Sequence, residues 1–344
     1  MTKQKLRWGV LGCADIAVRK VIPGIQKSQT GSVIAVASRS QEKADAAATQ
    51  FGIARAYGNY EELLADRDVD AVYIPLPNHL HKEWTIRAAQ AGKHVLCEKP
   101  IALSAAEAEE MVVACAKAGV LLAEAFMYRH HPRYERISQI VRSGEIGVIR
   151  GIHATFTFNN ASDFGNVRYR REWGGGSLYD VGCYPISAAR LILADEPVAA
   201  TAVGFTSSQH DDVDMMVSGL VEFPNAVGLT FDCAMWAAPR NTLEVLGSDG
   251  RIEVANAFVG EDLSIKVITS RGERVEAFPN LDAYTLQADD FADALLNGGV
   301  FGSNRRTPSR TCASSTRACN RWRLVSGSKS RSDSVTHLPE AVRP

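Results

Sequence analysis

Residues 6–17 read LRWGVLGCADIA, an apolar run that ends at Gly12 and is followed by small residues. Gly12, Ala14 and Ala17 occupy the three positions of the G-x-G-x-x-G/A pattern, with alanine at the second and third. In dinucleotide-binding folds this pattern makes a tight turn after the first strand and points a helix N-terminus at a pyrophosphate. The alternative is that the small residues only pack a helix against a buried strand. We interpret the motif as a nucleotide-binding turn made by Gly12, Cys13, Ala14, Asp15 and Ile16.

Apolar runs and segments of helical period alternate through the first 125 residues. The expected strands are 6–11, 33–37, 71–74, 94–97 and 120–123, and the expected helices are 16–28, 41–51, 61–65, 80–91 and 105–118. Continuous apolar strands alternating with helices are typical of a parallel sheet covered on both faces. Ser104 and Glu107 form a capping box that begins the last helix. Residues 1–125 are therefore predicted to be an α/β Rossmann domain with a doubly wound parallel sheet.

The pattern changes after Arg150. Apolar and polar residues alternate over 152–158, and further strands are expected at 199–205, 216–223, 227–231, 243–246, 252–254, 263–269 and 274–278. Only 178–193 and 284–296 have a helical pattern there. Residues 126–298 are therefore predicted to be an α+β domain with a large, mostly antiparallel open sheet.

Composition restricts the possible partners and the location. The chain has 344 residues, 38 basic and 39 acidic, so its net charge of −1 does not attract nucleic acid or an anionic membrane. No apolar run approaches the roughly 18 residues that span a bilayer. Seven cysteines without a C-x-x-C pair argue against a disulfide framework. We expect a cytoplasmic protein without a nucleic-acid or membrane partner.

The last part of the chain differs in composition from the rest. Residues 301–344 hold 9 basic and 2 acidic residues, 9 serines and no helical or strand period. We interpret residues 299–344 as an atypical basic Ser/Arg-rich tail read from a shifted frame, in place of a closing amphipathic helix. The alternative is a basic tail that binds an acidic partner.

The residues after the second expected strand bear on the choice of cofactor. An NAD-selective site has Asp or Glu there, about twenty residues beyond the glycines, to bind the ribose hydroxyls. This chain has Ser38 and Arg39, with Lys43 one turn later. A carboxylate repels a 2′-phosphate, whereas a guanidinium binds it through two parallel hydrogen bonds. The pattern favours NADP over NAD, with NAD possible as a second cofactor; the alternative is a solvated arginine in a loop.

Two loops are expected to meet at one edge of the parallel sheet. The fourth strand is followed by residues 75–79, and the fifth ends at Cys97-Glu98-Lys99-Pro100. Ligands of open α/β sheets bind outside the carboxyl ends of the strands, which makes Lys99 a candidate for a buried cation. Farther along, Asp180 and Tyr184 are four residues apart, so one helical turn places both on one face. The three glycines before them are expected to let the backbone approach a ligand closely.

Five segments together resemble one enzyme family. They are GCADIA at 12–17, YIPLPNHLH at 73–81, AGKHVLCEKPIAL at 91–103, EAFMYRHHP at 124–132 and GGGSLYDVGCYPI at 174–186. Their order and form are similar to those of the glucose–fructose oxidoreductase / inositol dehydrogenase (Gfo/Idh/MocA) family, in its xylose and dihydrodiol dehydrogenase-like branch. Inositol dehydrogenases usually carry a histidine where this chain has Tyr184, which disfavours that branch.

The resemblance assigns roles to the quoted residues. It implies that Tyr184 exchanges the hydroxyl proton, that Lys99 supplies the cation a tyrosine needs near neutral pH, and that Asp180 holds the lysine and a substrate hydroxyl. The implied cofactor contacts include Leu76, Asn78, His81, Glu98 and Lys99, with Asn78 and His81 on the nicotinamide side.

For the remaining candidate substrate and metal-binding residues, a purely structural role explains the sequence equally well. Walls of a sugar pocket are expected from Arg129, Arg168, Trp173 and Tyr284, although each could be a plain interface residue. His79 and His81 have no third ligand at useful spacing, so no metal site is expected. His130 and His131 are expected to be surface residues where a helix begins.

The expected function is hydride transfer between NADP and a carbinol or carbonyl group of a sugar or polyol, as in an aldose 1-dehydrogenase or glucose–fructose oxidoreductase. One alternative is a ketoreductase of nucleotide-linked deoxysugars. Another, from a different class, is a non-catalytic regulator that senses NADP. A homodimer or homotetramer is expected from the resemblance.

Overall fold

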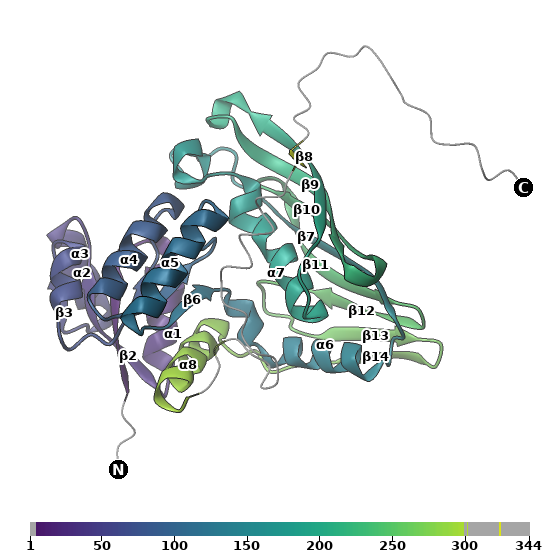
Figure 1. Ribbon diagram of the computed structural model, residues 1–344, viewed down its shortest axis with the longest axis horizontal. Helices are drawn as coiled ribbons and strands as arrows, with labels where there is room; N and C mark the ends of the chain where they lie inside the picture. Colours follow the sequence, from purple (N-terminus) through teal and green to yellow (C-terminus); the bar gives the residue numbers. More distant parts are fainter. Residues whose placement is uncertain (1–4, 299–300, 302–322, 325–344) are drawn as a thin grey trace, which may run out of the picture.

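The computed structural model describes residues 5–298, 301 and 323–324 (Figure 1). The tail predicted for residues 299–344 therefore lies outside the described residues, apart from residues 301 and 323–324. In the part of the chain that is described, no helix has the length and apolar character needed to cross a membrane.

The first sheet is parallel and has six strands, in the order β3-β2-β1-β4-β5-β6. The strands are β1 (Leu6–Leu11), β2 (Gly31–Ala37), β3 (Arg55–Tyr57), β4 (Ala71–Ile74), β5 (His94–Glu98) and β6 (Leu122–Ala125). This order confirms the predicted doubly wound α/β sheet. Only β3 is unexpected, because three residues are too few to show a period.

Helices cover both faces of this sheet. They are a π-helical turn η1 (Ala17–Val21), α1 (Ile22–Lys27), α2 (Gln41–Phe51), α3 (Tyr60–Ala65), α4 (His81–Gln90) and α5 (Ala105–Ala118). The N-cap of α5 forms as predicted, because the Ser104 hydroxyl accepts from the Glu107 amide at 3.2 Å. The Glu107 carboxylate accepts from the Leu103 amide at 3.0 Å, one residue before the amide that a capping box uses.

One helix from late in the chain packs against the first domain. The side chain of Phe291 in α8 (Ala283–Leu296) packs against Trp8 of β1 with the two rings tilted at 44° and their centroids 4.9 Å apart. Thr285 donates its hydroxyl hydrogen to the Gly24 carbonyl at 2.9 Å, and a Cβ on Gly24 would come within 2.8 Å of Tyr284. Although the predicted boundaries group α8 with residues 126–298, its buried face completes the core of the first domain.

The second sheet is mostly antiparallel, as predicted, and its strand order is β14-β13-β12-β11-β7-β10-β9-β8-β15. Only the β7–β10 and β8–β15 pairs are parallel. The strands are β7 (Ile149–Asn159), β8 (Ala199–Ser207), β9 (Val213–Phe223), β10 (Val227–Ala234), β11 (Trp236–Gly247), β12 (Gly250–Ala255), β13 (Ile265–Thr269), β14 (Gly272–Glu276) and β15 (Arg323–Leu324).

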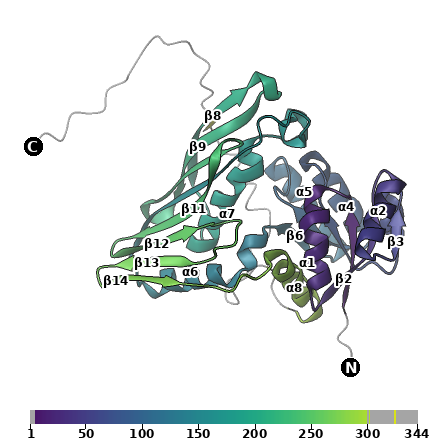
Figure 2. The same cartoon turned by 180° about the vertical axis from the view of Figure 1, so that it is seen from behind.

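Two helices pack on one face of the large sheet, α6 (Pro132–Ser143) and α7 (Cys183–Leu193). Figures 1 and 2 both place α7 on the side of the large sheet that faces the first domain. The sequence indicates a helix start at His130 and His131 but does not predict the extent of α6, which begins at Pro132. The expectation that His130 and His131 lie on the surface was wrong: the ring of His131 caps α6 and is buried, and the side chain of His130 is 2% exposed against Asp290.

Candidate active site

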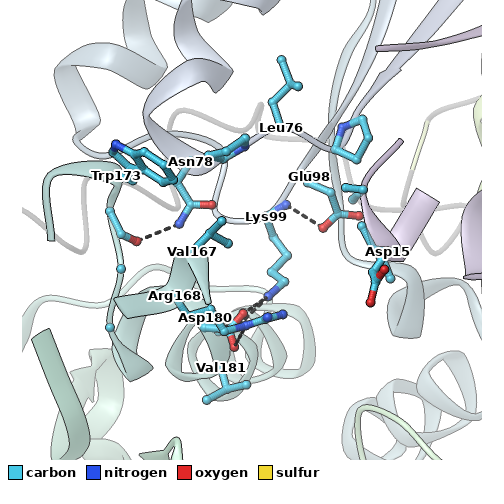
Figure 3. Close-up of a pocket in the computed structure, with 18 of the residues that line it drawn as sticks. Asp15, Leu76, Asn78, Glu98, Lys99, Val167, Arg168, Trp173, Asp180 and Val181 are labelled. Carbon is cyan, nitrogen blue, oxygen red and sulfur yellow. Dashed lines mark hydrogen bonds and ion pairs between the residues drawn. The ribbon is translucent and has the colours of Figure 1, made fainter. Parts of the chain in front are cut away.

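A cavity of about 500 Å³ lies between the carboxyl ends of the parallel strands and the start of α7. Figure 3 shows Lys99 reaching across it from the end of β5 toward Asp180 and Arg168. The lining residues are Ala14, Asp15, Ile16, Pro75, Leu76, Pro77, Asn78, Glu98, Lys99, Ala125, Met127, Phe156, Phe158, Val167, Arg168, Trp173, Gly174, Gly175, Gly176, Asp180, Val181, Tyr184 and Tyr284. The structure therefore brings the three predicted catalytic residues into one cavity.

Asp180 is held between two cations. The Lys99 ammonium donates to the Asp180 carbonyl at 2.5 Å and to its Oδ1 at 3.1 Å, and the Arg168 Nε donates to its Oδ2 at 2.6 Å. Asp180 lies in a π-helical turn, η6 (Leu178–Gly182), directly before α7. The resemblance implied that Asp180 holds Lys99 and a substrate hydroxyl; Arg168 is a further partner that the sequence did not assign to it.

The charges of this cluster stabilise each other. Burial raises the pKa of Asp180, but Lys99 and Arg168 outweigh it and hold that pKa below its ordinary value. Burial lowers the pKa of Lys99, but Asp180 outweighs it and raises that pKa above its ordinary value. Near neutral pH the cluster of Asp180, Lys99 and Arg168 therefore holds one carboxylate and two cations.

Tyr184 is enclosed by aromatic rings. Its ring meets those of Phe126 and Phe156 edge to face, with centroids 5.5 and 5.2 Å away. The Lys99 ammonium lies over the Tyr184 ring, 5.1 Å from its centroid, and the hydroxyl donates to the Met127 sulfur at 3.8 Å. Burial raises the pKa of Tyr184 well above its usual value. The pKa of Tyr184 is therefore raised here by burial, and not lowered as the resemblance implied for a tyrosine beside the Lys99 cation.

The residue before Lys99 places a second carboxylate in the cavity. Glu98 accepts from the Tyr73 hydroxyl at 2.7 Å and from the Lys99 amide at 3.2 Å. Burial raises the pKa of Glu98, although Lys99 acts to lower it. Its place at the end of β5 agrees with the predicted cofactor contact.

The turn after β1 fits a pyrophosphate. Gly12 has a φ of +124°, and a Cβ there would lie 3.1 Å from the Leu76 side chain. Ala14 and Ile16 line the cavity beyond it. The side chain of Cys13 is turned away, with its thiol 3.7 Å from the Lys43 carbonyl. Small residues thus line the cavity at the start of the first helix, where a dinucleotide phosphate is expected to bind.

The residues predicted to select NADP lie outside the cavity lining, in the loop after β2 and the start of α2. Ser38 is buried and its hydroxyl accepts from the Ser40 amide at 3.3 Å. Arg39 and Lys43 are exposed. The guanidinium of Arg39 lies near the Tyr60 hydroxyl. Burial raises the pKa of Tyr60, and the charge of Arg39 acts to lower it.

The sequence predicts that Asn78 and His81 flank the nicotinamide, but only Asn78 lines the cavity. Asn78 lines the cavity and donates to the Gly174 carbonyl at 2.8 Å, which connects the two domains. His81 is completely buried, and its ring nitrogens face the carbonyls of Leu76 and Pro100. The expectation that His81 lines the crevice was wrong, because backbone groups enclose its ring.

The glycines at 174–176 are needed mainly for contacts within the protein. Any larger residue at these positions would collide with its neighbours: a Cβ on Gly174 would lie 2.2 Å from the Leu103 side chain, and a Cβ on Gly176 would lie 2.1 Å from the Asp214 carboxylate. Asp214 accepts from the Ser177 hydroxyl and the Leu178 amide, both at 2.7 Å, and so caps the turn that carries Asp180. Sequence reasoning missed Asp214, although an acidic residue between apolar neighbours in a strand was an available signal.

Three of the four proposed substrate walls line the cavity, namely Arg168, Trp173 and Tyr284. Trp173 stacks on His79 at a centroid distance of 5.3 Å. Arg129 is outside the lining; its guanidinium lies 5.9 Å from the Phe126 ring. Among the described residues, no group of His, Cys, Asp and Glu is arranged to hold a metal ion.

The fold and this cavity define an oxidoreductase with a Rossmann domain for a nicotinamide dinucleotide. Residues 6–126 match the model of the oxidoreductase family with an NAD-binding Rossmann fold, and residues 134–253 match the GFO/IDH/MocA C-terminal domain. The chain belongs to the GFO/IDH/MocA family of oxidoreductases, as the resemblance predicted.

Two characterised relatives act on different sugars. A D-xylose 1-dehydrogenase (NADP(+)) of Haloferax volcanii is 39% identical over 297 residues, which are 85% of this chain and 90% of that protein. A dTDP-3,4-didehydro-2,6-dideoxy-alpha-D-glucose 3-reductase of Streptomyces violaceoruber is 38% identical over 307 residues, 87% of each. Among solved structures, a mutant 3-ketoreductase of Actinomadura kijaniata in complex with TDP-benzene and NADP has a TM-score of 0.85 and 32% identity, covering 94% of this chain and 99% of that chain.

Proposed function

We propose that this protein transfers a hydride between NADP and a carbinol or carbonyl carbon of a sugar or polyol, in the manner of an aldose 1-dehydrogenase. The observation that carries the proposal is the arrangement of Lys99, Asp180 and Tyr184 around one cavity at the carboxyl ends of the parallel strands. A charged lysine, a carboxylate and a phenol in one enclosed site are the groups that proton transfer to a sugar oxygen requires.

The chain's own residues bind the substrate oxygen and move its proton. Bound NADP supplies or accepts the hydride. An ammonium group has three donors and Lys99 uses two of them on Asp180, which leaves one for the substrate oxygen. The raised pKa of Tyr184 keeps its hydroxyl protonated near neutral pH, so Tyr184 can donate to a carbonyl oxygen during reduction.

The preference for NADP rests on Ser38, Arg39 and Lys43. The loop after β2 has no carboxylate at these positions, and the guanidinium of Arg39 is exposed where it can meet a phosphate. The Actinomadura enzyme, whose fold this chain shares, was crystallised with NADP.

A panel of free aldoses, polyols and nucleotide-linked sugars, assayed with NADP(H) and NAD(H), tests the proposed activity. We expect turnover of at least one free sugar, faster with NADP than with NAD, and its loss in Lys99→Met. Binding of NADP without turnover of any member of the panel would contradict the proposal.

A second candidate is reduction of a nucleotide-linked keto sugar. It is favoured by the 38% identity to the Streptomyces dTDP-sugar reductase and by the TDP-benzene complex of the Actinomadura enzyme. In the same panel, activity confined to nucleotide-linked substrates would select this candidate.

The third interpretation, a regulator that senses NADP, does not require Lys99 or Tyr184, yet the chain has both. The homodimer or homotetramer and the cytoplasmic location stay predictions.

A further inference from the structure

His81 is a buried imidazole between two loops of the site. It is the first residue of α4 and has 0% exposure. Its Nε2 lies 2.8 Å from the Leu76 carbonyl oxygen, and its Nδ1 lies 2.8 Å from the Pro100 carbonyl oxygen. Both distances are those of good hydrogen bonds.

The two carbonyls belong to the two loops that form the first domain's half of the cavity. Leu76 follows β4, lines the cavity, and lies against the turn at Gly12. Pro100 directly follows Lys99 at the end of β5. The imidazole therefore connects the backbone of the cofactor side to the backbone that carries the lysine.

The number of carbonyls that the His81 ring can bind depends on its protonation state. Carbonyl oxygens only accept, and a neutral imidazole has one N–H, so it can bind one carbonyl, whereas an imidazolium can bind both. Burial lowers the pKa of His81; the two carbonyls raise it, and the nearby Lys99 and His79 lower it further. The state of this ring is thus coupled to the charge of Lys99.

We propose that His81 is a positioning residue whose neutral ring donates to one of the two carbonyls at a time: through Pro100 it holds the loop of Lys99 so that the ammonium meets Asp180, and through Leu76 it holds the cofactor loop. The inference rests on the proposed function, because it assumes that Lys99 acts in the reaction. His81 itself has no exposed surface and does not line the cavity, so it is assigned no direct contact with substrate or cofactor.

Two substitutions of His81 each remove one of its two contacts and keep the other. An asparagine amide takes the place of Nδ1, so His81→Asn can still donate to Pro100; a glutamine amide takes the place of Nε2, so His81→Gln can still donate to Leu76. A displacement of about 1 Å in a reacting group can cost roughly 100-fold in rate. We expect His81→Gln to lower kcat by about 10- to 100-fold with the Kd for NADP within about threefold. His81→Asn should keep kcat within about threefold and weaken NADP binding instead.

A double substitution distinguishes positioning from general destabilisation. If His81 acts through Lys99, adding His81→Gln to Lys99→Met should lower kcat by no more than about twofold further, because coupled residues do not add. Multiplied losses, or equal kcat losses in the Gln and Asn variants that follow their melting temperatures, would overturn the inference. Normal turnover of Lys99→Met alone would instead contradict the proposed function.

A measurement that leaves His81 unchanged covers the case in which its variants do not fold. The ring resonances of His81 are titrated by NMR in the wild type and in Lys99→Met. Removing the positive neighbour should raise the pKa of His81, and an unchanged titration would refute the coupling between this ring and Lys99.

Discussion

Replacing Lys99 by methionine removes the charge and keeps a chain of similar length. The Lys99 side chain is 13% exposed and its ammonium makes two hydrogen bonds, both to Asp180. Arg168 still binds Asp180 at 2.6 Å after the change, so the buried carboxylate keeps a cation. The free energy of unfolding should therefore fall by about 3 kcal/mol, because two hydrogen bonds of the ammonium are lost and each contributes roughly 1.5 kcal/mol at the low end of the range for charged groups.

The effect on turnover should be as large as the effect on folding or larger. Loss of a group that assists proton transfer lowers turnover by about 10²- to 10⁴-fold. That loss corresponds to about 2.7–5.4 kcal/mol of transition-state stabilisation. The Kd for NADP should stay within about tenfold, because we assign the phosphates to the turn at Gly12 and not to Lys99.

The assay follows the absorbance of the reduced nicotinamide with the best substrate of the panel, and NADP binding is measured separately by fluorescence. Lys117→Met, at an exposed position near the end of α5, is the matched control and should keep wild-type turnover. Near-normal turnover of Lys99→Met would refute the assignment of Lys99, and an equal loss in Lys117→Met would show that the assay reports something other than the site.

Three further predictions concern the proton donor, the cofactor and the tail. Tyr184→Phe keeps the ring in its aromatic surroundings and should lower turnover by about 10²- to 10⁴-fold, with loss of the alkaline rise of the oxidative rate; a preserved rise would assign it to another group. Arg39→Ala should weaken NADP binding by about 1–3 kcal/mol and leave NAD unchanged, whereas equal losses for both cofactors would make Arg39 structural. Sequencing the coding DNA tests residues 299–344: a shifted frame predicts a helix-forming segment in another frame, and an intact frame would refute that interpretation.

The elements of the first domain could be predicted because their signals are local. Strand β1 and helices α2 and α5 begin and end where their apolar runs and caps predict. The short β3 shows no period. The packing of α8 on the first domain also has no local signal, because it depends on the contact of Phe291 with Trp8, far apart in the sequence.

The candidate site was predictable where residues belong to motifs that meet at the strand ends. Lys99, Asp180 and Tyr184 share the cavity as the motifs implied. The second cation on Asp180 and the backbone contacts of His81 could not be predicted, because both depend on side-chain directions that spacing does not determine.

The central claim is that this chain catalyses hydride transfer at a sugar carbon with the help of Lys99. The most direct test supplies NADP and an aldose deuterated at its C1 carbon and analyses the nicotinamide by mass spectrometry. The account predicts deuterium in the reduced nicotinamide formed by the wild type, with a strong reduction in Lys99→Met. NADP that binds the wild-type protein but acquires no deuterium from any aldose of the panel would contradict it.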